Sequence, residues 1–180
     1  VEIDMMGDDA PRQAAASAID GLGAVDILVN CMGASRTIGL DESEEGWEAL
    51  MTLNWTRHRQ ITRCILPGMQ ERRWGRVVNV TGPNETTGLN SAGVAKAAVH
   101  AWSKGVSDLV AKEGVTVNCV APGYIETEMV AAIPPEVLEK LLKGVPVGRL
   151  GQASEIARTV QFLVDDEAGY ITGSVISVNG

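Results

Sequence analysis

The chain has few basic residues and no long apolar run, and these two absences exclude two classes of protein. Lysine and arginine total 15 against 23 aspartate and glutamate, which gives a formal net charge of −8. Contacts to phosphates supply most of the affinity for nucleic acids, so a binding surface needs clustered positive charge. The one basic cluster, at residues 72–76, is short and isolated. Apolar runs end well before the ~18 residues of a membrane span. We therefore expect neither nucleic-acid binding nor membrane insertion.

Cysteine is also scarce, and a signal-peptide pattern is missing. The three cysteines, Cys31, Cys64 and Cys119, are an odd number without metal-ligand spacing, and neither His58 nor His100 pairs with them. Reduced thiols of this kind are typical of a cytoplasmic protein. We expect a cytoplasmic chain without a metal site.

Hydrophobic residues make up 45% of the 180 residues, enough for one domain with a sizeable core over residues 1–180. Short runs rich in β-branched residues predict buried strands at 25–29, 76–81, 115–120 and 174–178, and residues 1–4 resemble the end of another strand. Helices are predicted from near Pro11 to Gly21, from 41–44 to 67–68, from Asn90 or Ser91 to Lys112, and from Ser154 to Leu163. This alternation predicts an α/β fold with a doubly wound, Rossmann-like parallel sheet.

Ligands of such sheets bind at the carboxyl ends of the strands. The loops expected there are 30–33, 81–90 and 122–127. They read Asn30-Cys31-Met32-Gly33, Thr81-Gly82 at the start of the second, and Pro122-Gly123-Tyr124-Ile125-Glu126-Thr127. With the C-terminal runs 155–157, 162–163, 170–173 and 178–180, they resemble the short-chain dehydrogenase/reductase family, and most of all its 3-oxoacyl-[acyl-carrier-protein] reductase-like branch. The resemblance covers residues 4–180. It implies an NAD(P)-dependent oxidoreductase acting on a small-molecule carbonyl or alcohol substrate.

Two features of that family are missing at the amino-terminal side. The family has a glycine-rich loop whose backbone amides hold the dinucleotide pyrophosphate, and this sequence has no such motif. Aligned on the family, the chain lacks the first two β-α units, about 30 residues each. We therefore expect an N-terminally truncated domain, a fragment of a longer protein, in preference to a natural minimal domain.

The resemblance assigns a set of positions to the cofactor. Asp4 and Met5 correspond to the adenine contact, although Asp4 fits a helix-capping turn equally well. The ribose side corresponds to residues 30–33, where Met32 replaces a small residue. Pro122, Gly123, Ile125 and Thr127 correspond to the nicotinamide side. The complete set is Asp4, Met5, Asn30, Cys31, Met32, Gly33, Val80, Lys96, Pro122, Gly123, Ile125 and Thr127.

The catalytic positions depart from the family. Its chemistry uses a Tyr four residues before a Lys on one helix, because that spacing puts both on one face. The Lys charge lowers the pKa of the phenol, which exchanges a proton with the substrate oxygen. A Ser polarises that oxygen, and an Asn holds a water for the proton relay. Here Lys96 and Asn54 are present, but the Tyr position is Ala92 and the Ser position is Gly82.

Several residues could replace the missing hydroxyls. Ser91 and Thr81 are each one residue off the required position and are expected to point elsewhere. Glu85, Thr86, Thr87 and Tyr124 are further candidates, and Lys96 acting through a water is the simplest. Because two catalytic side chains are missing, a non-catalytic subunit that binds cofactor or an oligomer partner stays open as the alternative function.

Two partners follow from the resemblance. Arg73 corresponds to a position that docks acyl carrier protein in this branch, although a lone surface Arg is usually only solvated. The two long helices, which carry Trp47, Trp55 and Trp102, correspond to those that pair subunits in the family. Core packing explains the same tryptophans, so the expected homo-oligomer rests on the resemblance.

Overall fold

Four parallel strands form one sheet in the order β1-β2-β3-β4. The computed structural model describes residues 2–35, 38–83 and 90–180. The strands are β1 (Ile27–Asn30), β2 (Gly75–Val80), β3 (Val115–Pro122) and β4 (Val175–Val178). The sequence predicted all four to within two residues, because central strands of parallel sheets are buried on both faces and read as continuous apolar runs. The Rossmann-like α/β class is confirmed.

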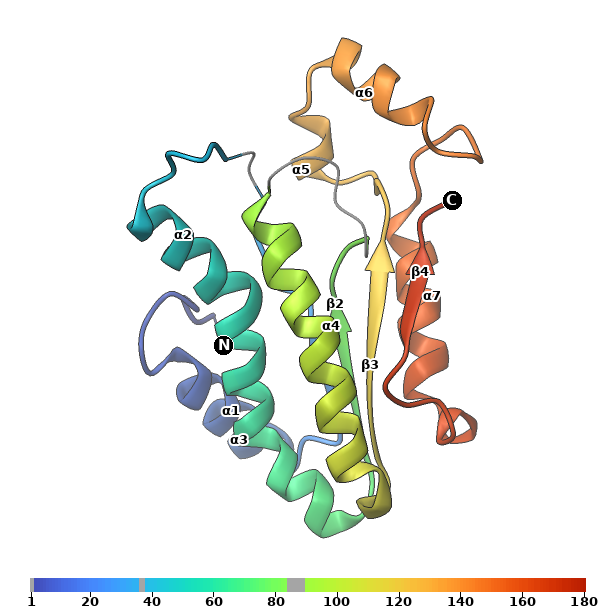
Figure 1. The fold of residues 1–180 in the computed structure, drawn as a ribbon. Coiled ribbons are helices and arrows are strands. Elements are labelled where there is room, and N and C mark those ends of the chain that lie inside the picture. Colours follow the sequence, from blue (N-terminus) through green and yellow to red (C-terminus); the bar gives the residue numbers. More distant parts are fainter. Residues whose placement is uncertain (1, 36–37, 84–89) are drawn as a thin grey trace.

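Helices cover both faces of this sheet (Figure 1). One face carries α1 (Ala10–Leu22), α3 (Arg57–Arg72) and α4 (Ser91–Val110). Here Ile65 and Met69 pack with Val77 and Val117 in one core cluster. The opposite face carries α7 (Ala153–Val164), whose Ile156 and Leu163 pack with Val78 and Val120 in a second cluster. Adjacent residues of β2 and β3 thus point to opposite faces and contribute to different cores.

Two short helices, α5 (Glu128–Ala131) and α6 (Pro135–Leu142), lie beyond the carboxyl ends of the strands (Figure 1). They form the segment between β3 and α7 and are mostly exposed. Two 3-10 turns, η2 (Ala111–Glu113) and η3 (Asp166–Ala168), lie at the other end of the molecule. Helices α5 and α6 therefore lie over the carboxyl end of the sheet, and the two 3-10 turns lie at its amino end.

The helix predicted from 41–44 to 67–68 is longer and less regular than the sequence suggested. It begins as α2 (Glu44–Met51), capped by Ser43, whose Oγ accepts the Gly46 N–H at 3.1 Å. It then passes through a π-helical turn, η1 (Thr52–Thr56), and continues as α3. The expected end at Pro67 is wrong. Pro67 lies inside α3, where the buried Ile65 and Met69 keep the helix packed on the sheet, and the helix ends at Arg73 with φ 55°.

Three further boundaries differ from the sequence prediction. Residues 2–4 form no strand, because none of the four described strands pairs with them. Helix α1 continues past Gly21 and stops at Gly23, where φ is 77° and only glycine is unstrained. Gln152, rather than Ser154, caps α7 in a reciprocal box with Glu155.

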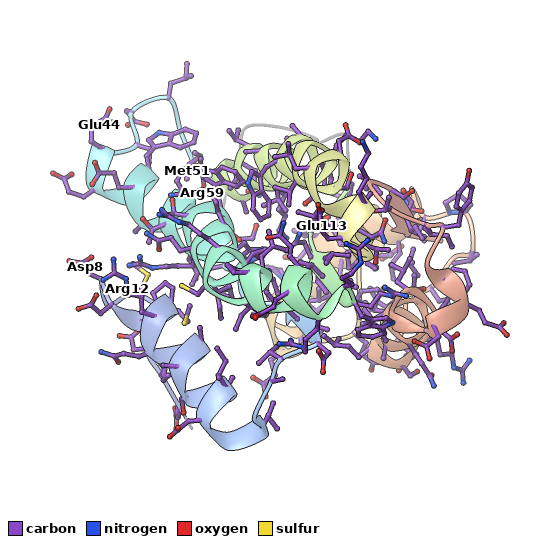
Figure 2. All side chains as sticks on the ribbon, turned by 90° about the horizontal axis from the view of Figure 1, so that it is seen from below. Asp8, Arg12, Glu44, Met51, Arg59 and Glu113 are labelled. Carbon is purple, nitrogen blue, oxygen red and sulfur yellow. The ribbon has the colours of Figure 1, made fainter. Side chains whose placement is uncertain are left out.

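Helix α1 packs along α3, and their contact holds the amino-terminal segment in place. Figure 2 shows Asp8 and Arg12 beside the first part of α3. Arg57 of α3 donates from Nε to the Met5 carbonyl at 2.7 Å and from Nη2 to the Met6 carbonyl at 2.9 Å. Among the described strands β1 pairs with β2 alone, and its Ile27 and Val29 side chains are 44% and 42% exposed. The expected truncation stays a prediction.

Candidate active site

The three predicted loops line one cavity of about 820 Å³ at the carboxyl ends of the strands. Cys31 and Ser35 come from the loop after β1, Thr81, Gly82 and Pro83 from the loop after β2, and residues 122–125 and Thr127 from the end of β3 and beyond. The apolar wall opposite them comes from α5, α7 and the residues around them, namely Met129, Val130, Ile133, Ala153, Ile156, Ala157 and Val160. The cavity thus combines a few polar groups with a largely apolar wall, as small-molecule sites do.

Lys96 reaches this cavity from α4. Asn90 caps the helix, its Oδ1 accepting from the Ala92 N–H at 2.9 Å and the Gly93 N–H at 3.3 Å. Burial lowers the pKa of the Lys96 amine, and its interaction with Cys31 acts weakly in the other direction. A half-buried ammonium with a lowered pKa gives up its proton more readily than an exposed one.

The side chain of Lys96 lies against residue 82. A Cβ added to Gly82 would be 3.2 Å from Lys96 Cδ and 3.5 Å from Nζ. Gly82 lines the cavity, whereas Ala92 is 2% exposed and is not among the described residues in the cavity wall. Neither position carries a hydroxyl, and the lysine partly fills the space next to Gly82.

Asn54 lies in the π-helical turn and holds the loop after β1. Its Nδ2 donates to the carbonyls of Ala34 at 2.9 Å and Leu50 at 2.8 Å, and its Oδ1 accepts the Ala34 N–H at 3.2 Å. A Cβ on Gly33 would be 2.7 Å from that Oδ1, so glycine permits the close approach. The Asn54 side chain is buried and is not among the described groups that line the cavity.

The predicted cofactor positions divide into two groups. Seven line the cavity, and they are Cys31, Val80, Lys96, Pro122, Gly123, Ile125 and Thr127. The other five are used elsewhere: Asn30 donates from Nδ2 to Thr62 and Asn79 in the core, and the Met32 carbonyl accepts from His58 at 2.9 Å. Gly33 lies against Asn54, as described above. Asp4 accepts the Met6 N–H at 2.9 Å, and the Met5 carbonyl accepts from Arg57.

The segment that follows β3 has a fixed geometry. Gly123 donates its N–H to the Val178 carbonyl at 3.0 Å, and a Cβ there would be 2.8 Å from Asn179 Cα. A side chain at residue 123 would therefore push β3 and β4 apart. Thr127 caps α5, its Oγ1 lying 3.4 Å from the Val130 N–H and 3.3 Å from the Ile125 carbonyl. Backbone and hydroxyl groups of this segment are thus held at the cavity wall.

The replacements considered for the missing hydroxyls have different outcomes. Tyr124 lines the cavity, while Ser91 is fully buried and Thr81 directs its hydroxyl to the Val120 carbonyl at 3.1 Å. Glu85, Thr86 and Thr87 lie outside the described residues. Arg73 donates from Nη2 to the Lys112 carbonyl at 2.8 Å, so part of its guanidinium is used within the fold.

His100 and the cavity-lining Ser35 are polar residues near the site that the sequence reasoning missed. The Nε2 of His100 lies 2.7 Å from Thr81 Oγ1. The signal was available, because His100 follows Lys96 by four residues and shares its helix face. The apolar wall from α5 and α7 was also missed, since nothing in the pattern of those helices distinguishes a cavity wall from core packing.

Comparisons with known proteins agree with this architecture. A family model described as enoyl-(acyl carrier protein) reductase matches residues 1–180. The chain is 42% identical over 164 residues to an acetoacetyl-CoA reductase of Shinella zoogloeoides, covering 88% of this chain and 68% of that protein. It is 42% identical over 165 residues to the 3-oxoacyl-[acyl-carrier-protein] reductase FabG of Vibrio cholerae, covering 89% and 68%. The chain thus spans about two thirds of the length of these relatives.

Structural similarity extends over almost the whole chain. The crystal structure of gox2181 superposes with a TM-score of 0.92 at 28% sequence identity, covering 99% of this chain and 73% of that one. Within residues 2–35, 38–83 and 90–180, none of the helices is both long and apolar enough to cross a membrane.

Proposed function

The chain belongs to the short-chain dehydrogenase/reductase family, and on that premise we propose that it is an NAD(P)-dependent oxidoreductase for a carbonyl or alcohol substrate with an altered proton-donating site. The observation that carries the proposal is the position of Lys96. Lys96 lies in the wall of the cavity beside Gly82, a position that carries no hydroxyl in this chain. We take 3-oxoacyl thioesters as the candidate substrates, because two of the relatives are named as reductases of such compounds.

The residues of this chain fit the nicotinamide end of the cofactor. Pro122, Gly123 and Ile125 offer backbone at the cavity wall, and Thr127 offers a hydroxyl. When bound, the nicotinamide ring supplies the hydride. A glycine-rich cradle for the pyrophosphate is not among the described residues. On the ribose side, Cys31 is the residue of 30–33 that lines the cavity.

Lys96 then manages the proton. As hydride reaches the carbonyl carbon, negative charge grows on the oxygen, and the Lys96 ammonium stabilises it and donates a proton directly or through one water. In the reverse direction the neutral amine accepts the alcohol proton. Asn54 acts at a distance, since it fixes residues 33–34 next to Cys31 and so shapes that side of the cavity. Gly82 contributes by leaving room for the Lys96 side chain.

The test uses the full-length protein and Lys96→Ala, with reduction of acetoacetyl thioester followed by NADH or NADPH consumption. Removal of a general acid lowers the rate by a factor of about 10²–10⁴. Lys104→Ala is the matched control, because Lys104 lies two turns further along the same helix, is exposed and pairs with Asp108 at 2.9 Å. Unchanged turnover in Lys96→Ala would contradict the role of the lysine.

The absence of hydroxyls at residues 82 and 92 favours a second candidate, a non-catalytic subunit that retains cofactor binding. Wild-type protein that binds NADH or NADPH in calorimetry but turns over no ketone would support this alternative. We also propose a homo-oligomer that pairs through α4 and the long helix formed by α2, η1 and α3. Trp55 of η1 and Trp102 of α4 pack edge to face at 5.7 Å, and Leu109 of α4 is 77% exposed. The three cysteines form no disulfide, in keeping with a cytoplasmic location.

A further inference from the structure

His100 and Thr81 connect α4 to the strand end beside Lys96. Thr81 Oγ1 lies 2.7 Å from His100 Nε2 and 3.1 Å from the Val120 carbonyl oxygen. Thr81 also donates its backbone N–H to the same carbonyl at 2.8 Å. The next residue is Gly82, whose Cα faces the Lys96 side chain. The His100 ring therefore contacts Thr81, which is bonded to Val120 of β3 and is followed by the glycine beside Lys96.

The hydrogen-bond pattern determines the form of the histidine. The Thr81 hydroxyl has one proton, and if it is donated to the Val120 carbonyl the oxygen can only accept from His100. This assigns the ring hydrogen to Nε2. A protonated ring keeps that N–H, so protonation adds a charge without breaking the bond to Thr81.

That charge would appear next to Lys96. Burial lowers the pKa of His100, and the Lys96 ammonium, one helical turn away, lowers it further. His58 of α3 is the other histidine affected by Lys96, and Cys31 is the thiol that faces the amine from the loop after β1. Lys104, one turn beyond His100, is exposed and paired with Asp108. At neutral pH the described surroundings of Lys96 therefore hold two neutral imidazoles.

We propose that His100 is a positioning residue of this site: its Nε2–H, through Thr81, fixes the end of β2 against which Lys96 lies, and its protonation drives the Lys96 ammonium away from the cavity wall. This inference rests on the proposed reductase function. It assigns to the chain a pair of side chains, Thr81 directly after β2 and His100 on α4, that supports the lysine where the two family hydroxyls are missing.

The variants separate the hydrogen bond from the charge. His100→Gln can still donate to Thr81 but cannot titrate, whereas His100→Ala does neither. At neutral pH we expect His100→Ala and Thr81→Val to lower kcat by about tenfold to 100-fold, the effect of misplacing a reacting group, and His100→Gln and Thr81→Ser to retain most of the turnover. On acidification, wild-type turnover should fall as pH drops through the His100 pKa, below its usual 6.5. His100→Gln should lack this decline.

A second measurement does not depend on turnover. Exchange of the imidazole C2 proton, followed by mass spectrometry, reports the pKa of each histidine in the full-length protein. Lys96→Met should raise the pKa of His100, and Lys104→Met should leave it unchanged. An unaltered His100 pKa in Lys96→Met, or an acid decline that persists in His100→Gln, would overturn the proposal. Wild-type protein without turnover would refute the reductase function, and the exchange measurement would still decide the coupling.

Discussion

Lys96 lies against the position that a side chain on residue 82 would occupy, with Nζ 3.5 Å from a Cβ built on Gly82. The position of the Lys96 side chain therefore depends on the absence of a side chain at residue 82. A serine at residue 82 would need the lysine chain to move by a few tenths of an ångström, since its Cδ would be only 3.2 Å away. The Lys96 side chain lies where it does because residue 82 carries no side chain and therefore no hydroxyl.

This relationship predicts the outcome of restoring the family residues. Gly82→Ser with Ala92→Tyr should raise ketone reduction by up to about 10²-fold, because it supplies a phenol on the face of Lys96 and a second donor for the oxygen. Ala92 is 2% exposed, so the tyrosine should also lower the unfolding free energy by about 1–3 kcal/mol through overpacking. Steady-state rates and urea denaturation measure both effects.

The matched control is Gly82→Ser with Ala92→Phe, which adds the same ring without the hydroxyl. It should lower stability in the same way and give no comparable gain in rate. Equal rates for the Tyr and Phe variants would mean that the cavity does not place a substrate oxygen near residue 92.

The three thiols should differ in reactivity toward iodoacetamide. Cys31 is exposed in the cavity, and Cys64 is partly buried. Cys119 is fully buried, and burial raises its pKa to about 11, so its reactive thiolate is scarce at neutral pH. Peptide mass spectrometry should find modification in the order Cys31, Cys64, Cys119. Bound NADH or NADPH should protect Cys31 from modification and leave the modification rate of Cys64 unchanged. Equal protection of both thiols would contradict cofactor binding next to Cys31.

The strands and the cavity-lining loops were predictable because their signals are local. Buried strands such as β3 read as continuous β-branched runs, and the carboxyl ends of parallel strands must meet at one edge of the sheet. Helix ends were less predictable. Pro67 reads as a helix end, yet tertiary packing of Ile65 and Met69 carries α3 past it. Gly21 reads as a stop in the sequence, whereas the helix ends at Gly23, where φ is 77°.

The direction of individual side chains could not be read from the sequence. Asn30 and Asn54 belong to family motifs, but in the structure Asn30 bonds to Asn79 in the core and Asn54 bonds to Ala34. Both assignments depend on hydrogen bonds between residues distant in sequence. The spacing of His100 from Lys96 is visible in the sequence, but its contact with Thr81, 19 residues earlier, is not.

Glu155 should make stability depend on pH in the acidic range. Its carboxylate accepts hydrogen bonds from Nη1 and Nη2 of Arg149, each at 2.9 Å, and from the Gln152 N–H at 2.7 Å. These interactions, led by the hydrogen bonds from Arg149, lower the pKa of Glu155 from 4.5 to about 2. A lowered carboxyl pKa stabilises the folded state above 4.5, and the contribution is lost as pH falls from 4.5 to about 2.

Melting temperatures of wild type and Glu155→Gln, measured from pH 7 to pH 2, test this. The wild type should melt higher at neutral pH, and the difference should shrink between 4.5 and about 2. Glu167→Gln serves as the control, since Glu167 is exposed in η3 and its backbone N–H, not its carboxylate, makes the bond to Asp165 at 2.9 Å. A difference that stays constant with pH would show that the Gln variant acts through packing rather than charge.

Asn90 should contribute measurably to stability as the cap of α4. Its Oδ1 accepts two backbone N–H groups that have no partner within the helix, and its Nδ2 donates to Ser35 Oγ at 3.1 Å. Asn90→Ala should lower the unfolding free energy by about 1 kcal/mol, as loss of an N-cap does. Asn90→Ser keeps a capping oxygen but is too short to reach Ser35, so it should recover most of the loss if the cap is the main contribution. Urea denaturation measures the unfolding free energy of each variant. If Asn90→Ser does not recover the loss, the effect comes from the hydrogen bond between Asn90 and Ser35, which joins α4 to the loop after β1.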